Sequence, residues 1–247
     1  MLPEIVQRGD PDRFAATLAL PSGLQGRLWP LWAFNLEVAR APWVSSNPLI
    51  AEMRLQFWAD VVEEAAPRAH EVAGPLHGLL TQAPALRAVL AQLIEARRQD
   101  IARERFSDSG LDAYLEATSA GLLWAAALAC EAPPEAETAF RALGWALGLA
   151  NFLRALPELQ ARGWQALDTD PAALRLKAAE GLNHLAIARA QKGAMGRAAP
   201  VAVYGWQAGG LLRLAHDNPL RVGEGKLALS EFRRRGGLIW TAFTGRF

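Results

Sequence analysis

Residues 142–159 read "ALGWALGLANFLRALPEL", and this stretch decides the fold. Its small residues Gly144, Gly148, Asn151 and Ala155 are three or four positions apart, so a helix would place them in one stripe. Such a stripe either lets a neighbouring helix pack closely or leaves a hollow for a ligand. Helix packing is the simpler explanation, and a ligand pocket is kept as the alternative.

A polar seam runs beside this stripe. Asn151, Arg154 and Glu158 follow one another at helical spacing and are candidates for lining a cavity or binding a ligand. Arg154 and Glu158 are four residues apart, a spacing at which opposite charges pair for about 0.2–0.5 kcal/mol. The seam offers one carboxylate, whereas a metal site would need several.

Helical periodicity extends along the whole chain. Pro48 and Pro67 bracket one amphipathic segment, and residues 84–106 form another. Helices are also expected at residues 11–20, 25–41, 112–130, 135–160, 171–192, 198–216 and 224–236. No segment alternates polar and apolar residues convincingly, and no long linker or change of composition divides the chain. The sequence therefore predicts an all-α protein with a single domain over residues 1–247.

Composition excludes several classes of protein. Of the 247 residues, 51% are hydrophobic and 21% charged, with a formal net charge of +1. This balance excludes a disordered chain and a nucleic-acid binder that relies on bulk charge. Cys130 is the single cysteine and lies in an apolar run, so we expect a buried, inert thiol in a reducing compartment. With no apolar targeting segment at the N-terminus and no apolar run long enough to span a bilayer, a cytoplasmic protein is expected.

A metal site formed between two helices would need ligands from a second segment, and "LWAFNLEVARAPW", residues 31–43, is the candidate. A magnesium site that holds a diphosphate needs carboxylates at i, i+4 spacing on two facing helices. Here Asn35, Ala39 and Trp43 share one helical face, and the only carboxylate, Glu37, points to another. One isolated acid cannot hold a cluster of metal ions.

Six segments carry a resemblance to the squalene/phytoene synthase family. They are, in the order seen in that family, "DPDRFAATLALP", "LWAFNLEVAR", "EMRLQFWADVVEE", "LIEARRQDI", "YLEATSAGLLW" and "ALGLANFLRALPEL". The resemblance covers about residues 10–190, with a weaker match to the end. It implies a single-domain helical bundle around a central cavity, the trans-isoprenyl-diphosphate-synthase (terpenoid synthase) fold.

The resemblance does not extend to the family's first aspartate-rich motif. Its acids would correspond to Ala39, Arg40 and Trp43, and none of these is acidic. A later phrase, Gly-Arg-x-Tyr-Leu-Pro in the family, is reduced to "ARGWQALD" at residues 161–168, without Tyr or Pro. Arg40 places a cation where metal ions would be bound.

The second motif, Asn-x-x-Arg-Asp-x-x-x-Asp, is kept only in its first half. Asn151 and Arg154 match, but the two acids correspond to Ala155 and Leu159. Losing all these acids removes the means of neutralising a diphosphate leaving group, which is worth several kcal/mol of transition-state stabilisation. The resemblance thus implies a protein without catalytic residues, resident metal or cofactor.

Within the family, "AFNLE", "RLQFW" and "TSAGLL" resemble a degenerate branch that contains a mitochondrial complex I assembly factor. This branch implies a non-catalytic protein that binds a partner such as a respiratory-complex subunit. Because no presequence is recognised at the N-terminus, we expect a bacterial protein. Two alternatives stay open. The chain could be a prenyltransferase that condenses two prenyl diphosphates head to head, with Glu37, Asn151, Arg154 and Glu158 forming an improvised Mg²⁺ site. It could also bind an isoprenoid or lipid in its cavity without chemistry.

Three further groups of polar residues each allow two interpretations. Arg54 belongs either to an amphipathic helix with Phe57 and Trp58 in the core, or to a cavity where it binds an anion. Asp100 pairs with Arg97 or Arg103, either on a solvated face or in the cavity. His70 and His77 are seven residues apart and are expected to be capping or exposed rather than metal ligands.

The C-terminal stretch "LSEFRRRGGLIWTAFTGRF" places Arg233, Arg234 and Arg235 before an apolar and aromatic run. That run contains Leu238, Ile239, Trp240 and Phe243. Basic residues beside such a run favour peripheral membrane contact or a protein partner. The simpler expectation is a last helix whose apolar side closes the bundle.

Overall fold

The computed structural model describes residues 1–247 and contains helices but no strands, which confirms the all-α prediction. The α-helices are α1 (Leu2–Gly9), α2 (Pro11–Leu18), α3 (Ser22–Arg40), α4 (Pro48–Glu63), α5 (Ala73–Gln82), α6 (Leu86–Arg97), α7 (Gln99–Ala102), α8 (Asp108–Leu115), α9 (Gly121–Ala129), α10 (Glu137–Ala161), α11 (Pro171–Ala190), α12 (Ala208–Asp217), α13 (Leu220–Gly223) and α14 (Glu231–Thr244). Short 3₁₀ segments are η1 (Ala41–Trp43), η3 (Pro134–Ala136) and η4 (Lys192–Gly205), and η2 (Glu116–Ala120) is a π-helical turn. No helix combines the length and the apolarity needed to cross a bilayer.

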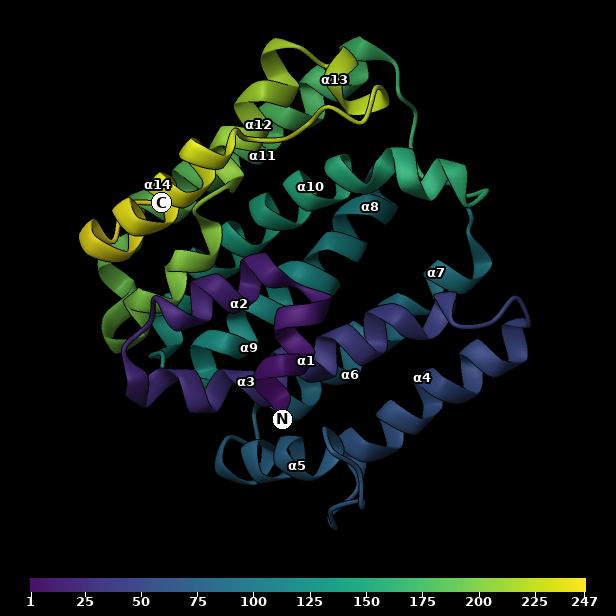
Figure 1. Ribbon diagram of the computed structural model, residues 1–247, viewed down its shortest axis with the longest axis vertical. Helices are drawn as coiled ribbons and strands as arrows, with labels where there is room; N and C mark the ends of the chain where they lie inside the picture. Colours follow the sequence, from purple (N-terminus) through teal and green to yellow (C-terminus); the bar gives the residue numbers. More distant parts are fainter.

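Helix α10 is the centre of the bundle (Figure 1). It contacts α11 and α12 on one side and α9, η2 and η4 on the others. Helices α3, α4, α5 and α6 form the opposite part of the molecule, and α14 lies on the outside against η4. One continuous set of buried apolar side chains joins these parts, because nearly every helix contributes a hydrophobic face to it.

The small residues of α10 serve close packing at one end of their stripe. A Cβ on Gly144 would lie 2.7 Å from the Ala120 Cα and 2.8 Å from the Ser119 carbonyl oxygen. The Ser119 hydroxyl donates a hydrogen bond to the Gly144 carbonyl, at 2.8 Å. The π-helical turn η2 therefore rests directly on the α10 backbone, and helix packing explains this part of the stripe.

Gly144→Ala is expected to lower the free energy of unfolding by about 1–3 kcal/mol, because a backbone contact cannot yield to the added methyl group. Gly23→Ala is the matched control, since no heavy atom lies within 4 Å of its added Cβ. In a helix this control change is neutral or stabilising. Urea denaturation of both variants measures the difference, and equal stabilities would contradict the close packing.

Some elements differ from the sequence prediction. Helices α1 and α5 were not expected, and the last helix spans Glu231–Thr244 rather than 224–236. Ser230 begins it, because its hydroxyl accepts a hydrogen bond from the Arg233 backbone N–H. The helix expected at 198–216 is instead η4 followed by α12. Gly196 has φ of 55°, which interrupts regular α-helix within η4.

Two titratable side chains away from the cavity, one buried and one half-buried, have shifted pKa values. Cys130 is buried as predicted, and burial raises the pKa of its thiol to about 11. His184 stacks on Trp145 with ring centroids 4.1 Å apart. Burial lowers the pKa of His184, while nearby carboxylates such as Glu180 oppose the shift.

The shifted His184 pKa predicts a loss of stability in acid. Because the folded protein favours the neutral ring, His184 stabilises the fold above its unfolded pKa of about 6.5, and this contribution falls as the pH drops below that value. Wild type should therefore lose more stability than His184→Gln between about pH 7 and pH 5. Thermal unfolding across this range measures the difference, and parallel curves would contradict the assignment.

Candidate functional site

A cavity of about 550 Å³ lies against the middle of α10. Helices α3, α6, α8 and α9 contribute to its wall, together with the turn between α1 and α2 and the end of η4. Gly148, Asn151 and Ala155 line it from α10. The small stripe thus has two uses, because Gly144 and Gly148 pack against η2 whereas Asn151 and Ala155 open onto the hollow.

Positions that the resemblance assigns to metal-binding acids come together at this cavity. Ala39 and Trp43 line it from one side, and Ala155 and Leu159 line it from α10. Arg40 is exposed and does not line it. The two helical faces therefore converge as the fold requires, but they present apolar side chains.

Trp43 occupies its place as part of an aromatic cluster. Its ring lies 6.1 Å from that of Trp164, and the guanidinium groups of Arg103 and Arg162 lie over it at 4.8 and 5.3 Å. The Trp164 indole N–H donates to the Glu104 carbonyl, at 2.8 Å. At a position where the resemblance would place a carboxylate, the chain therefore has an aromatic side chain with two cations next to it, and these cations would repel a metal ion.

Three acids do line the cavity, and each is engaged by an arginine. Asp10 lies 3.3 Å from an Arg13 nitrogen, Asp100 pairs with Arg97, and Asp12 pairs with Arg234. No group of three or more His, Cys, Asp or Glu side chains is placed to hold a metal ion. These residues do not fit a Mg²⁺ site, because its ligands would first have to release their cations.

A buried triad forms the deepest polar part of the wall. An Arg97 guanidinium nitrogen donates to Asp100 at 3.0 Å and to the Tyr114 hydroxyl at 2.6 Å. That hydroxyl donates to the other Asp100 oxygen, at 2.8 Å. Asp100 is 1% exposed, so burial raises its pKa while Arg97 and Tyr114 act in the opposite direction. The pairing of Asp100 with Arg97 was predicted, but the solvated face was wrong, because α7 turns this side chain inward.

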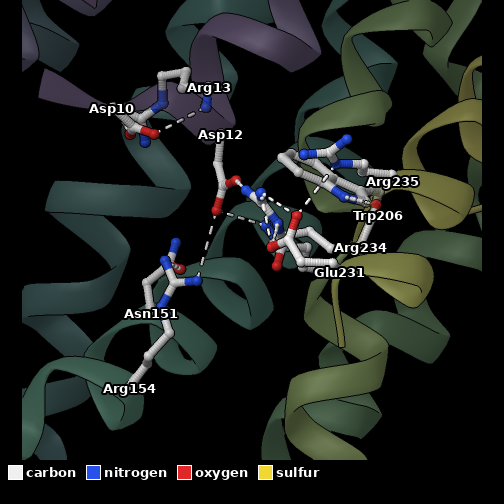
Figure 2. A network of polar contacts seen from close by, with 10 residues as sticks. Asp10, Asp12, Arg13, Asn151, Arg154, Trp206, Glu231, Arg234 and Arg235 are labelled. Atoms are coloured by element: carbon white, nitrogen blue, oxygen red, sulfur yellow. Dashed lines mark hydrogen bonds and ion pairs between the residues drawn. The ribbon is translucent and has the colours of Figure 1, made fainter. Parts of the chain in front are cut away.

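At the rim of the cavity, the Asp12 carboxylate contacts side chains from several segments (Figure 2). Asp12 accepts a hydrogen bond from the Gln207 amide at 2.8 Å and pairs with Arg234 of α14. Arg154 of α10 lies 3.7 Å from the same carboxylate and donates to the Asn151 side chain at 3.1 Å. Asp12 therefore links α2, α10 and α14, three segments that are distant in the sequence.

Of the six candidate residues named from the sequence, three line the cavity and three do not. Asn35, Asn151 and Arg154 line the cavity. Asn35 is 6% exposed, and its buried side-chain oxygen has no hydrogen-bond partner. An unpartnered buried acceptor is costly, which makes Asn35 well suited to accept a hydrogen bond from a ligand in the cavity.

The other three candidates lie outside the cavity. Glu37 is on another face of α3, as predicted, and Arg54 is exposed on α4, so its proposed role in the cavity is wrong. Glu158 points outward and pairs with Arg162 at 2.6 Å, so the expected pair with Arg154 does not form. Trp58 and Phe57 do pack in or against the core. His70 is a capping residue, because its ring nitrogen accepts from the Val72 backbone N–H.

Several lining residues were missed. Gln207 gave no signal, because it lies between η4 and α12 and meets Asp12 only in the folded chain. Tyr204 also lines the cavity, and its hydroxyl contacts Thr17 at 2.7 Å and accepts from the Trp32 indole N–H at 2.8 Å. The local signals were the family segments "DPDRFAATLALP", which contains Asp12, and "YLEATSAGLLW", which contains Tyr114 two residues before η2.

Among curated proteins, this chain is similar to assembly factors of complex I. Complex I assembly factor 6 homologue of Drosophila melanogaster is 31% identical over 165 residues, covering 62% of this chain and 49% of that protein. The Homo sapiens complex I assembly factor 6 is 26% identical over 162 residues, with coverage of 62% and 48%. The chain spans about half the length of the curated relatives it matches.

A solved structure shows the same fold. A dehydrosqualene synthase crystallised with a ligand superposes with a TM-score of 0.77 at 13% sequence identity, covering 100% of this chain and 96% of that one. The family model described as squalene/phytoene synthase matches residues 6–208. Since this match spans most of the sequence, including every helix from α2 to η4, the chain belongs to the squalene/phytoene synthase family.

Proposed function

We propose that this chain is a non-catalytic member of its family, which acts by binding and serves as an assembly factor for a membrane respiratory complex. The observation that carries the proposal is the apolar lining at Ala39, Trp43, Ala155 and Leu159. The names of the curated relatives, complex I assembly factor 6, support the choice of partner.

Charge in the cavity supports the same proposal. Ionising a prenyl diphosphate requires metal ions or several free cations around the leaving group. The lining arginines Arg13 and Arg97 are instead paired with Asp10 and Asp100. Arg154 lies 3.7 Å from Asp12, a carboxylate that it shares with Arg234, so each lining cation has an acid beside it. The improvised metal site also loses support, because neither Glu37 nor Glu158 lines the cavity.

Two measurements test the proposal. Deleting the gene from its host should reduce the assembled respiratory complex without removing a terpenoid product, and the wild-type gene should restore the complex. Purified protein with Mg²⁺ and farnesyl or geranylgeranyl diphosphate should release no diphosphate. Sustained turnover, or a terpenoid defect with a normal respiratory complex, would overturn the proposal.

A lipid or isoprenoid held in the cavity is a second candidate function, favoured by the unpartnered Asn35 oxygen in a lining that is about half hydrophobic. Its ligand would need an apolar body and one hydrogen-bond donor, such as a hydroxyl group. Mass spectrometry of an organic extract of the purified protein should find such a molecule. Replacing Ala155 by Trp would fill the hollow and should remove it, whereas an empty wild-type extract would count against this function.

A further inference from the structure

Helix α14 presents an apolar face to solvent. Phe232, Ile239, Trp240 and Phe243 are 87%, 67%, 57% and 93% exposed. Together with Gly236 they recur at three- or four-residue spacing, so they lie along one face of the helix. Isolated exposed apolar residues are ordinary, but four large ones on one helical face form a surface that needs a partner.

The opposite face already holds the helix on the bundle. Arg234 pairs with Asp12, and the Trp206 indole N–H donates to the Arg234 carbonyl at 3.1 Å (Figure 2). Thr241 is buried, and the carbonyl of Phe247 accepts a hydrogen bond from Arg189 at 2.6 Å. The last helix was expected to close the bundle with its apolar side, but its exposed aromatic side chains point the other way.

Cations border this apolar face. By helical spacing, Arg233 lies next to Trp240 on one side and Arg235 next to Ile239 on the other. Arg235 shares its only acidic partner, Glu231, with Arg234, and Arg233 forms no ion pair. The exposed ion pair between Arg235 and Glu231 contributes little binding energy, so the edge of the apolar face keeps a net positive charge.

The positive border continues past the end of α14. Arg246 is exposed and forms no ion pair. A Cβ on Gly245 would lie 3.1 Å from the Lys192 ammonium group, which places that cation beside the helix end as well. Four cations surround the apolar stripe, against one acid at its start.

We propose that α14 docks on the surface of an anionic lipid bilayer, with its axis in the plane of the membrane. Phe232, Ile239, Trp240 and Phe243 would enter the boundary between headgroups and acyl chains, as in amphipathic helices that lie on membranes. The bordering arginines would bind lipid phosphates while their aliphatic stems cover apolar surface. Charge complementarity selects a lipid surface over a protein, because the cations flank the stripe on both sides without matching acids.

This inference rests on α14 and does not depend on the assembly-factor proposal. It also predicts how the cavity is oriented relative to the bilayer. Asp12 at the rim is bound to Arg234, so the rim lies directly behind the docked helix. A docked protein would hold its cavity next to the bilayer.

Flotation with lipid vesicles tests the proposal. Wild type should float with vesicles of phosphatidylglycerol and phosphatidylcholine, and much less with pure phosphatidylcholine or in high salt. Phe232→Glu with Phe243→Glu should reduce binding to anionic vesicles at least about tenfold, since burying two carboxylates opposes insertion. Arg233→Gln with Arg246→Gln should reduce the preference for anionic lipid.

The control uses another exposed apolar surface. Leu49 and Met53 on α4 are 66% and 65% exposed, so Leu49→Glu with Met53→Glu makes the same chemical change away from α14. This variant should bind vesicles like wild type. Circular dichroism and thermal unfolding confirm that each variant is folded. The proposal fails if wild type does not float with anionic vesicles, if both Glu variants lose binding equally, or if α14 buries its stripe in a dimer that cannot bind lipid.

Discussion

Asp100→Ala is expected to lower the free energy of unfolding by about 3–5 kcal/mol, because it leaves the buried Arg97 guanidinium without its counter-charge. Asp100 is 1% exposed and accepts hydrogen bonds from both Arg97 and Tyr114. A domain of ordinary stability, about 5–15 kcal/mol, would lose a large part of its margin. Chemical denaturation monitored by far-ultraviolet circular dichroism measures the change.

The matched controls separate a buried ion pair from an exposed one. Tyr114→Phe removes one hydroxyl from the triad and should cost about 1.5–3 kcal/mol, the range for hydrogen bonds to charged groups. Glu158→Ala breaks the exposed pair with Arg162 and should cost at most about 1 kcal/mol. Equal effects for Asp100 and Glu158 would mean that the triad is solvated and that the cavity wall is not closed at this point.

Long periodic helices were predictable from the sequence alone. The expected helix 135–160 is observed as Glu137–Ala161, and 171–192 is observed as Pro171–Ala190. Each buries a continuous apolar stripe, so local pattern and tertiary packing favour the same structure. The short helices α1 and α5 were missed because eight or ten residues show too few turns for periodicity to be recognised.

The last helix was misplaced for a related reason. The basic and apolar run was recognised, but its start depends on the Ser230 cap. Which side of α14 faces the bundle depends on Arg234 reaching Asp12, a contact between residues 222 positions apart. No local pattern contains that information. The sequence therefore suggested that the apolar side of α14 is buried. In the structure the opposite side faces the bundle, through the ion pair of Arg234 with Asp12 and the hydrogen bond from Trp206.

The candidate site was predictable where it follows one helix and not where helices meet. Asn35, Asn151 and Arg154 were found because they share faces with positions of the family motifs. Glu158 was wrongly included because helical spacing permits a pair with Arg154, although Arg162 competes for the same carboxylate. The long-range partners of Arg154, and the depth of Asp100, became visible only with the packed structure.

Introducing acids at the cavity is expected to create a magnesium response. In a variant with Ala39→Asp, Ala155→Asp and Leu159→Asp, three carboxylates would face the same hollow. Without metal they should destabilise the fold, since close like charges repel and are partly desolvated. Magnesium binding only to the folded variant would offset this cost, by about 2.7 kcal/mol when the ion is at 100 times its Kd. Thermal unfolding in magnesium chloride and in EDTA measures the shift, which should be absent in wild type.

Asparagines at the same three positions provide the control, because they match the aspartates in shape but carry no charge to attract the ion. A magnesium response in the aspartate variant alone would mean that the helix faces still converge as a metal site requires, and that the identity of the side chains is what prevents binding. A response of equal size in wild type would mean that Asp10, Asp12 and Asp100 exchange their arginines for metal, and the non-catalytic proposal would then be wrong. Because the two outcomes differ in which protein responds, melting curves of wild type and of the aspartate variant, each in magnesium chloride and in EDTA, decide between them.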